Sequence, residues 1–287
     1  MSASPLHSGR VTASRRRVPP ELEIPLAAAS NLWKTRTHNL GRMTMDELVR
    51  AFFTYAAIQT YLALTVVAIV LAAFLATAAI PLAVAAILAV LVYPFVWYML
   101  HRYVLHGRYL YRSRWTAAAW KRIHFDHHQD PYDLRVLFGA LHTTLPTIAI
   151  ATVPIGWVVG GLAGATAAFS AGLLTTCFYE FCHCVQHLNT KPRSAFLQHI
   201  KRLHLAHHFH NEQGNFGITN FLWDRLFGTF YESPRQVSKS ATVFNLGYTE
   251  EEAARYPWVA ALSGGTRGDQ NPRRFRVDPD ARGDRAA

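Results

Sequence analysis

The sequence predicts an all-α integral membrane protein with four transmembrane helices arranged in two hairpins. Two runs of residues, 51–100 and 136–179, contain no Asp, Glu, Lys or Arg. Each run is too long for one buried helix of a soluble protein and long enough for two spans of about 20 residues. Turn-forming residues lie near the middle of each run, so we expect each run to fold back on itself.

Helix-breaking residues divide both runs. Pro81 lies within the first run, and proline costs about 3 kcal/mol inside a helix, so we expect a turn there. The stretch before Pro81 exceeds one membrane thickness, and we therefore expect its helix to tilt or to start in the membrane interface. The second run has four glycines at its centre, which indicates another reversal: Gly156, Gly160, Gly161 and Gly164.

Positive charge sets the predicted orientation. The 29 Lys and Arg residues all lie outside the uncharged runs, in the N-terminal segment, the loop between the runs and the C-terminal part. By the positive-inside rule these three regions face the cytoplasm. The formal net charge of +11 follows largely from this bias and favours contact with anionic lipid. Nucleic-acid binding is the weaker explanation, because the short basic run SRRRVPP has no binding motif beside it.

Three regions follow along the chain. Residues 1–45 are basic and rich in Pro and Ser, and we expect them to be disordered. Residues 46–232 form the membrane domain, which ends in an aromatic stretch predicted to pack beneath the membrane. Residues 233–287 form a C-terminal segment, in which TEEE at 249–252 has the form of a capping box and starts a short helix. The tail from about Ser263 is predicted to be disordered.

The histidines are grouped beyond what packing requires. Two copies of His-x-x-His-His, in RIHFDHH and RLHLAHH, lie 80 residues apart. Two further pairs stand at the ends of the predicted second and fourth spans. All of them fall on the predicted cytoplasmic side, so they can meet at one site. The ten candidate metal ligands are His101, His106, His124, His127, His128, His183, His187, His204, His207 and His208.

The spacing of these histidines is that of ligands on helices. Residues three and four apart share a helix face, so we expect the three rings of each His-x-x-His-His to point the same way. His183 and His187 are one turn apart, whereas His101 and His106 need a helix end or an irregular turn between them. Neutral imidazole is the commonest metal ligand.

Ten imidazoles are too many for one ion. Five for each of two ions leave an open position on an octahedral ion, whereas a structural zinc site closes at four ligands. In addition to the four membrane spans, we therefore predict a cytoplasmic helical cap that carries a histidine-rich dinuclear metal site.

These motifs resemble those of the fatty acid hydroxylase/sterol desaturase superfamily of membrane metalloenzymes. The resemblance covers residues 50–231 and rests on the four histidine motifs in order, on HRYVLH, on NFG at 215–217 and on WDRLFGT at 223–229. Together the motifs are specific for the superfamily and much less specific for one substrate. The resemblance implies a four-span helical bundle with a cytoplasmic cap, and it matches the superfamily's metal-binding histidines to the ten named above.

Members of the superfamily use dioxygen and external electrons to hydroxylate or desaturate lipids. The resemblance implies a membrane-bound di-iron oxygenase that hydroxylates a lipid, with an acyl chain of a fatty acid or membrane lipid as the favoured substrate. The implied cofactors are two iron ions, because zinc cannot change oxidation state, although purified protein can carry zinc.

The implied partners are the lipid, the membrane and a separate electron donor. A ferredoxin or a cytochrome b5-like protein with its reductase is expected, because the sequence contains neither a cytochrome b5-like domain nor a flavin or nicotinamide fingerprint. The Ala- and Arg-rich composition points to a bacterial inner membrane, with both termini and the metal site cytoplasmic.

Four polar side chains are candidates to hydrogen-bond the ligands, since metal-bound histidines usually donate their free ring N–H to such a group. Glu180 precedes His183 by one turn, and three others lie beside the motifs: Asp126, Asn215 and Asp224. For each carboxylate, a helix cap or a salt bridge with a nearby arginine is an equally good explanation. None is a predicted catalytic acid or base.

Two alternatives stay open at this point. Within the superfamily, the same oxidant serves a desaturase or a sterol or carotenoid hydroxylase, and only substrate geometry separates them. From another class, a membrane metal transporter or sensor also gathers histidines. A transporter places ligands near the bilayer midplane, whereas these histidines lie at the rims of the spans, which argues against transport.

Overall fold

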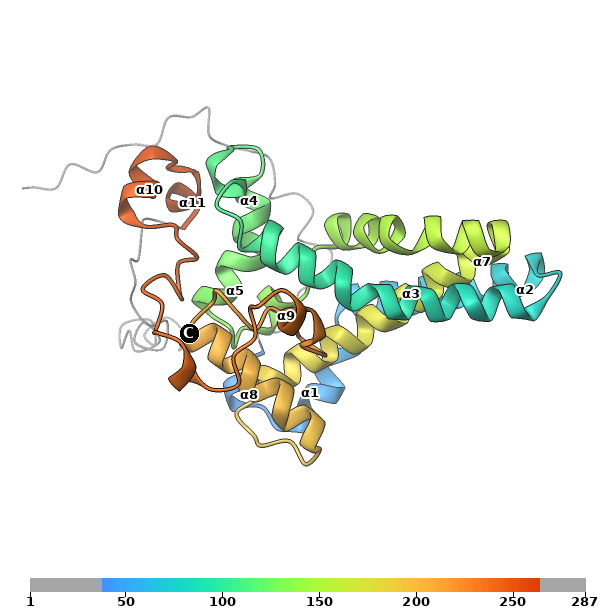
Figure 1. Ribbon diagram of the computed structural model, residues 1–287, viewed down its shortest axis with the longest axis horizontal. Coiled ribbons are helices and arrows are strands. Elements are labelled where there is room, and N and C mark those ends of the chain that lie inside the picture. The colour runs from blue at the N-terminus through green and yellow to red at the C-terminus, as the bar shows by residue number, and fades with distance from the viewer. Residues whose placement is uncertain (1–37, 264–287) are drawn as a thin grey trace, which may run out of the picture. The chain divides into compact units, whose positions relative to one another are not determined.

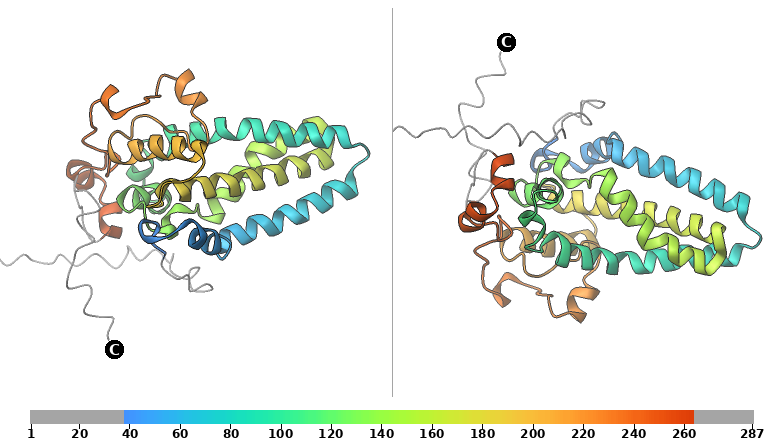
Figure 2. Two further views of the ribbon diagram at one scale, coloured as in Figure 1. Left: turned by 90° about the horizontal axis from the view of Figure 1, so that it is seen from below. Right: turned by 90° about the horizontal axis from the view of Figure 1, so that it is seen from above.

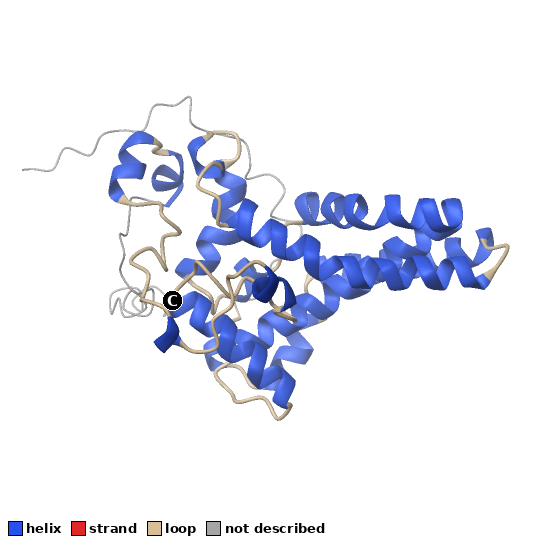
Figure 3. Cartoon of the chain, in the orientation of Figure 1, coloured by secondary structure: helices blue, strands red, loops and turns tan. Residues whose placement is uncertain are grey.

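The computed structural model describes residues 38–263. The described residues form helices and connecting loops without a β-strand, and one isolated bridge joins Asn39 to Asp133 (Figure 3). The disorder expected for residues 1–37 and 264–287 concerns residues outside this range. The helical character of the prediction is confirmed.

The first hairpin consists of α2 (Ala56–Leu75) and α3 (Ala79–Met99), which contain no charged side chain. The chain turns at residues 76–78. Pro81 follows in the first turn of α3, where its missing N–H breaks no helical hydrogen bond. The turn predicted near Pro81 is therefore confirmed.

The excess length before the hairpin is divided between two helices. α1 (Met45–Phe52) is amphipathic and starts at a capping box, in which Thr44 and Glu47 each bind the other's backbone N–H. Residues 53–55 break the helix before α2 begins. In place of one long helix that tilts or starts in the membrane interface, the structure has a short amphipathic helix followed by a 20-residue apolar one.

Residues 38–45 differ from the expectation of disorder. Leu40 and Met43 are buried in the same core as Leu48 and Phe52 of α1. The Asn39 side chain accepts a hydrogen bond from the Gly41 backbone N–H and caps η3 (Leu40–Arg42). A short segment with few apolar residues can still bury two of them, so the packed domain begins before residue 45.

The second hairpin is formed by α7 (Leu141–His187), which reverses at its glycines. Gly160 and Gly161 depart from helical geometry, with φ of −148° and +58°. A β-carbon placed at Gly172 would lie 2.8 Å from the Thr152 side chain, so the two arms of α7 pack against each other. Gly161 occupies a backbone conformation that favours glycine. The reversal predicted from the glycine cluster is confirmed.

Within residues 38–263, three helices are long and apolar enough to cross a membrane: 56–75, 79–105 and 134–187. α7 packs along both α2 and α3, and Figure 1 shows the three running side by side. Because the third folds back on itself, it supplies two antiparallel arms. That each arm crosses the membrane, giving four spans, stays a prediction.

The remaining elements gather at the end where α3 and α7 finish (Figure 2). One expected helix is confirmed there, since α10 is capped by Thr249. The elements of this region are η4 (Leu100–Leu105), η5 (Leu110–Arg112), α4 (Ala117–Trp120), η6 (Lys121–Phe125), α5 (Asp126–Gln129), α6 (Leu134–Leu137), α8 (Ala195–Phe209), α9 (Leu222–Leu226), η7 (Pro234–Gln236), α10 (Glu250–Arg255) and α11 (Trp258–Ser263).

Candidate metal centre

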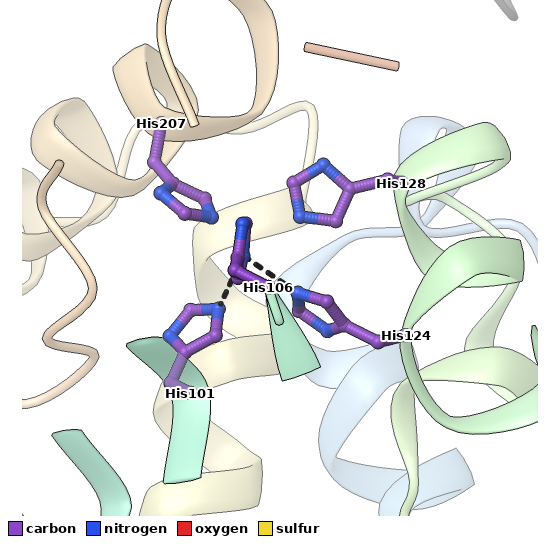
Figure 4. Close-up of side chains that lie close together, drawn as sticks. All are labelled: His101, His106, His124, His128 and His207. Carbon is purple, nitrogen blue, oxygen red and sulfur yellow. Dashed lines mark hydrogen bonds between the residues drawn. The ribbon is translucent and has the colours of Figure 1, made fainter. Parts of the chain in front are cut away.

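Ten histidines form two groups of five where the ends of α3 and α7 meet α5 and α8. Within each group, one ring nitrogen per residue lies within 4.8 Å of those of the other four. All are buried except the partly buried His106. The first group, drawn in Figure 4, is His101, His106, His124, His128 and His207, and the second is His127, His183, His187, His204 and His208.

A widened helical turn brings His101 and His106 together. η4 is a π-helical turn, in which the backbone N–H of His106 donates to the His101 carbonyl at 3.0 Å, five residues back. The wider turn lets residues five apart face the same side, and such turns recur at functional sites. A second π-turn, η6, leads into α5 and contains His124. The irregular turn predicted between His101 and His106 is confirmed.

Each His-x-x-His-His motif contributes to both groups, which contradicts the expectation that its three rings point the same way. In the first motif His124 and His128 join the first group, while His127 joins the second. The motif on α8 divides the other way, with only His207 in the first group. Positions i+3 and i+4 lie about 100° apart around a helix axis, so adjacent histidines can face different centres.

Backbone carbonyls orient three rings of the first group. Each ring donates its Nδ1–H, which leaves the lone pair of Nε2 facing the interior of the group. The pairs are His101 to Phe216 at 2.6 Å, His207 to Gly214 at 2.7 Å and His128 to Val243 at 3.1 Å. Each acceptor is at least seven residues away in sequence from the histidine that it binds. The loops after α8 therefore fix the tautomers of these three rings.

The inward-facing nitrogens lie close together in both groups. In the first, Nε2 of His106 is 3.2 Å from that of His101 and 2.8 Å from that of His124 (Figure 4). In the second, Nε2 of His183 is 3.0 Å from that of His127. Further Nε2 atoms, of His128, His207 and His208, are buried without a hydrogen-bond partner among the described residues.

This donor set fits a metal ion. Two nitrogens bound at about 2.1 Å and at right angles lie about 3 Å apart, which agrees with the Nε2 separations. Burial lowers the pKa of His128 and His207 to about 3, so both rings are neutral, as ligands must be. Packing alone does not explain why neutral rings converge in a buried space with ring nitrogens that lack a hydrogen-bond partner. Binding of a metal ion does explain it.

A mostly apolar cavity of about 290 Å³ adjoins both groups. His101 and His124 of the first group line it, as do three residues of the second, His127, His183 and His204. The cavity continues between α3 and α7, where its walls include Tyr93, Val96, Ile148 and Ala151. The histidines are thus reached from the region between the apolar helices.

Residues 86–229, half of the chain, match the family model described as fatty acid hydroxylase. The match includes all ten histidines of the two groups. The chain belongs to the fatty acid hydroxylase family.

Several relatives of this family member carry names that describe lipid hydroxylases. A ceramide very long chain fatty acid hydroxylase of Saccharomyces cerevisiae is 31% identical over 52% of this chain and 38% of its own length. A dihydroceramide fatty acyl 2-hydroxylase of Arabidopsis thaliana is 33% identical over 49% of this chain and 57% of its own length. A fatty acid 2-hydroxylase of Mus musculus is 29% identical over 49% and 37%. The chain therefore matches only about two fifths to three fifths of these relatives.

A solved structure shares the fold of this family member. It is described as full-length scs7p with only the hydroxylase domain visible, and it superposes with a TM-score of 0.54 at 27% identity. The superposition covers 64% of this chain and 68% of the other.

Of the four polar side chains predicted to hydrogen-bond the histidine ligands, Asp126 and Glu180 have other partners. Asp126 forms an ion pair with Lys121 at 2.7 Å, so the salt-bridge explanation holds for it, with a lysine instead of an arginine. Glu180 is buried, lines the cavity and accepts a hydrogen bond from the Gly139 backbone. In the described part of the chain its partners include no histidine ring.

Asn215 and Asp224 bind the loop that carries two of the carbonyl acceptors. The side chain of Asn215 pairs with both backbone groups of Tyr231, at 2.9 and 3.1 Å. The carboxylate of Asp224 accepts from the backbone N–H groups of Phe216 and Gly217. Burial raises the pKa of Asp224, and these donated hydrogen bonds oppose that shift.

Sequence reasoning missed the acceptors themselves. Gly214, Phe216 and Val243 act through backbone carbonyls, which carry no residue-specific signal. The position of Asn215 at φ 56° gives one indirect hint, because Asn tolerates this conformation and the NFG motif contains it. For Val243, the sequence offers no sign of its hydrogen bond to His128.

Proposed function

We propose that the chain is a membrane-bound di-iron oxygenase that hydroxylates a lipid, with an acyl chain as substrate, by means of dioxygen and external electrons. The observation that carries this proposal is the apolar cavity that runs from between α3 and α7 to both histidine groups. An acyl chain could enter it from the bilayer and present a carbon to the metal centre. The names of the matched relatives, which describe ceramide and fatty acyl hydroxylases, support the same chemistry.

The ten histidines are proposed to hold two iron ions, five rings to each. Iron bound there would supply the redox chemistry that oxidation of an unactivated C–H bond requires, which zinc cannot supply. The chain itself would keep the histidine rings neutral, orient their Nε2 atoms toward the interior of each group, and keep water from the apolar cavity. Val96, Ile148 and Ala151 would hold the substrate chain in line with the centre.

The overall reaction converts a C–H bond, dioxygen, two electrons and two protons into an alcohol and water. We propose that the electrons come from a separate protein, a ferredoxin or a cytochrome b5-like protein with its reductase. The histidine groups and both termini are proposed to face the cytoplasm of a bacterial inner membrane. This orientation rests on the Lys and Arg residues, which all lie outside the uncharged runs 51–100 and 136–179. The hydroxylase domain expected at residues 46–232 would also include the packed residues 38–45, with 233–287 as a C-terminal segment.

A metal transporter or sensor is the alternative from another class. Transporters bind their ions near the bilayer midplane, between broken helices. The histidine groups lie instead at the ends of α3 and α7, beside short helices that are too small to span a membrane. This placement favours an enzyme.

The test is oxidation of lipids by the iron-loaded protein under ¹⁸O₂. The chain is purified anaerobically in detergent, its metal content is measured, and it is reconstituted with iron, a chemical or protein reductant and candidate lipids. A hydroxylated acyl chain that carries one ¹⁸O atom supports the proposal. An alkene without ¹⁸O would identify a desaturase, and a labelled sterol or carotenoid would change the substrate. Metal flux across vesicles without lipid oxidation would favour transport.

A further inference from the structure

The loop Gly214–Gly217 holds two histidines of the first group at once. Its Gly214 carbonyl accepts the Nδ1–H of His207 from α8, and its Phe216 carbonyl accepts that of His101 from the end of α3. These two helices are distant in sequence, so the loop fixes the relative placement of the rings. A shift of the loop that breaks these contacts would release both rings and remove the hydrogen bonds that keep the proton of each on Nδ1.

The Asp224 carboxylate binds the backbone of this loop. It is fully buried and accepts three hydrogen bonds, from the backbone N–H groups of Phe216 at 2.8 Å and Gly217 at 2.9 Å and from the Thr229 hydroxyl at 2.8 Å. A β-carbon at Gly217 would lie 3.0 Å from the carboxylate and 2.0 Å from the Asn220 carbonyl, so the contact admits no side chain there. An amide in place of the carboxylate would put N–H groups against N–H groups.

We propose that Asp224 is a positioning residue for the metal of the first group. It acts through the Phe216 and Gly217 backbone on His101 and His207, and it touches neither the metal nor the substrate. The second group takes all its rings from α5, α7 and α8, and the Nδ1 atoms of four of them have no hydrogen-bond partner among the described residues, so no ring of these four is held by a carbonyl of this loop. The inference rests on the proposed assignment of metal ions to both groups.

The test compares Asp224→Asn with Asp126→Asn in the full-length protein, purified in detergent and titrated with Co²⁺. Bound metal is measured by elemental analysis, and the visible absorption of Co²⁺ reports ligand geometry. We expect about two Co²⁺ per chain for the wild type and for Asp126→Asn, whose carboxylate pairs with Lys121. For Asp224→Asn we expect 10–100-fold weaker binding of one Co²⁺ and unchanged binding of the other.

A second variant keeps the inference testable if Asp224→Asn does not fold. Thr229→Val removes one of the three donors to Asp224 and leaves both backbone contacts, so a smaller loss at the same site is expected. Unchanged Co²⁺ affinity and absorption in both variants would overturn the inference. A wild-type chain that binds two metals without oxidising lipid would count against the proposed function alone, whereas a wild type that binds no metal would remove the basis of both.

A second inference concerns the exposed side of α9, which carries apolar residues, whereas Asp224 on the same helix is buried. Leu222, Leu226 and Phe227 are 55%, 65% and 44% exposed. They are continuous with the exposed apolar surface of α3, because Trp223 packs against Phe95 with ring centroids 4.6 Å apart. Leu91, one turn before Phe95 on α3, is 64% exposed.

We infer that α9 and Phe227 lie in the interface of a lipid bilayer. Apolar side chains that continue the outer surface of a membrane-spanning helix are expected at acyl-chain depth. The exposed Arg225 between them lies 3.9 Å from the Glu232 carboxylate, so its charge is balanced at the edge of this surface. A spin label on Leu226→Cys, in phosphatidylcholine nanodiscs, should be more accessible to oxygen than to an aqueous nickel chelate. The reverse is expected for a label on Arg235→Cys in the exposed η7 turn. Equal aqueous access at both positions, or spin–spin broadening that reveals a second copy over α9, would overturn this inference.

Discussion

The two histidine groups have the same number of rings and are held in different ways. In the first, rings from η4, α5 and α8 donate to carbonyls at residues 214, 216 and 243, in loops after α8. In the second, the Nδ1 atoms of His127, His187, His204 and His208 have no hydrogen-bond partner among the described residues. The second group is therefore positioned by helix packing, and the first depends also on the C-terminal loops.

The difference has a physical reason. Helices α7 and α8 pack directly on each other, and the buried residues around their ends, Cys182, Ile200 and Leu203, form one apolar cluster. Rotation of a ring on such helices is limited by its neighbours. The rings of the first group come from two π-turns and separate segments, so hydrogen bonds to distant carbonyls must replace that restraint.

The largest expected effect is the loss of a ligand from either group. His128→Ala in the first group and His208→Ala in the second should each abolish lipid oxidation and lower bound metal, because both ions are proposed to take part. Insertion into the membrane should not change, since neither side chain is in an apolar helix. Elemental analysis of the purified variants is the measurement. Unchanged metal content in both variants would contradict the ligand assignment.

A change in the loop should separate the two groups. In Gly217→Ala the new β-carbon would lie 2.0 Å from the Asn220 carbonyl, so the loop must move. We expect weaker metal binding at the first group and a 10–100-fold loss of activity, with the second group unaffected.

Gly161→Ala is the control for this change. It also strains the backbone, at φ +58°, by about 1–3 kcal/mol, but at the reversal of α7, far from both groups in sequence. Equal metal loss in the two variants would show that general destabilisation explains the result. The thermal unfolding temperature of each variant provides the comparison.

A change in the cavity should lower activity and leave the metal content of both groups unchanged. Ala151→Phe would fill part of the cavity, whereas Ile150→Phe would alter a side chain that is 75% exposed on the outer surface of the same helix. We expect about tenfold lower activity on long acyl chains for Ala151→Phe, which corresponds to about 1.4 kcal/mol in the barrier. Both variants should keep full metal content. Equal activity of the two variants would argue against this cavity as the substrate site.

The smallest expected effect concerns the segment that carries the Val243 carbonyl. Thr249 caps α10, and its hydroxyl accepts a hydrogen bond from the Glu252 backbone N–H at 3.3 Å. Thr249→Ala should cost about 1 kcal/mol of stability, as for other N-caps, with metal content and activity retained. The measurement is the shift in unfolding temperature. A loss of metal would show that the first group depends on this segment more than one hydrogen bond to His128 suggests.

Several features of this protein follow from the sequence alone, because they are local. Charge-free runs, a proline and a glycine cluster define the two hairpins, and a capping residue, Thr249, marks the start of α10. The ten grouped histidines and their division into five and five follow from composition and spacing, as does the need for an irregular turn between His101 and His106.

Tertiary structure alone decided which histidine joins which group. Neighbouring helix positions differ by about 100°, so adjacent rings can face different centres, and which centre each ring joins is settled only when the facing helix is in place. It also decided that Asp126 pairs with Lys121 while Asp224 holds a loop, since both are acidic residues beside a motif. The backbone carbonyls that orient His101, His128 and His207 belong to loops, and the positions of these loops depend on the packed helices. The pattern of side chains in the sequence therefore does not predict them.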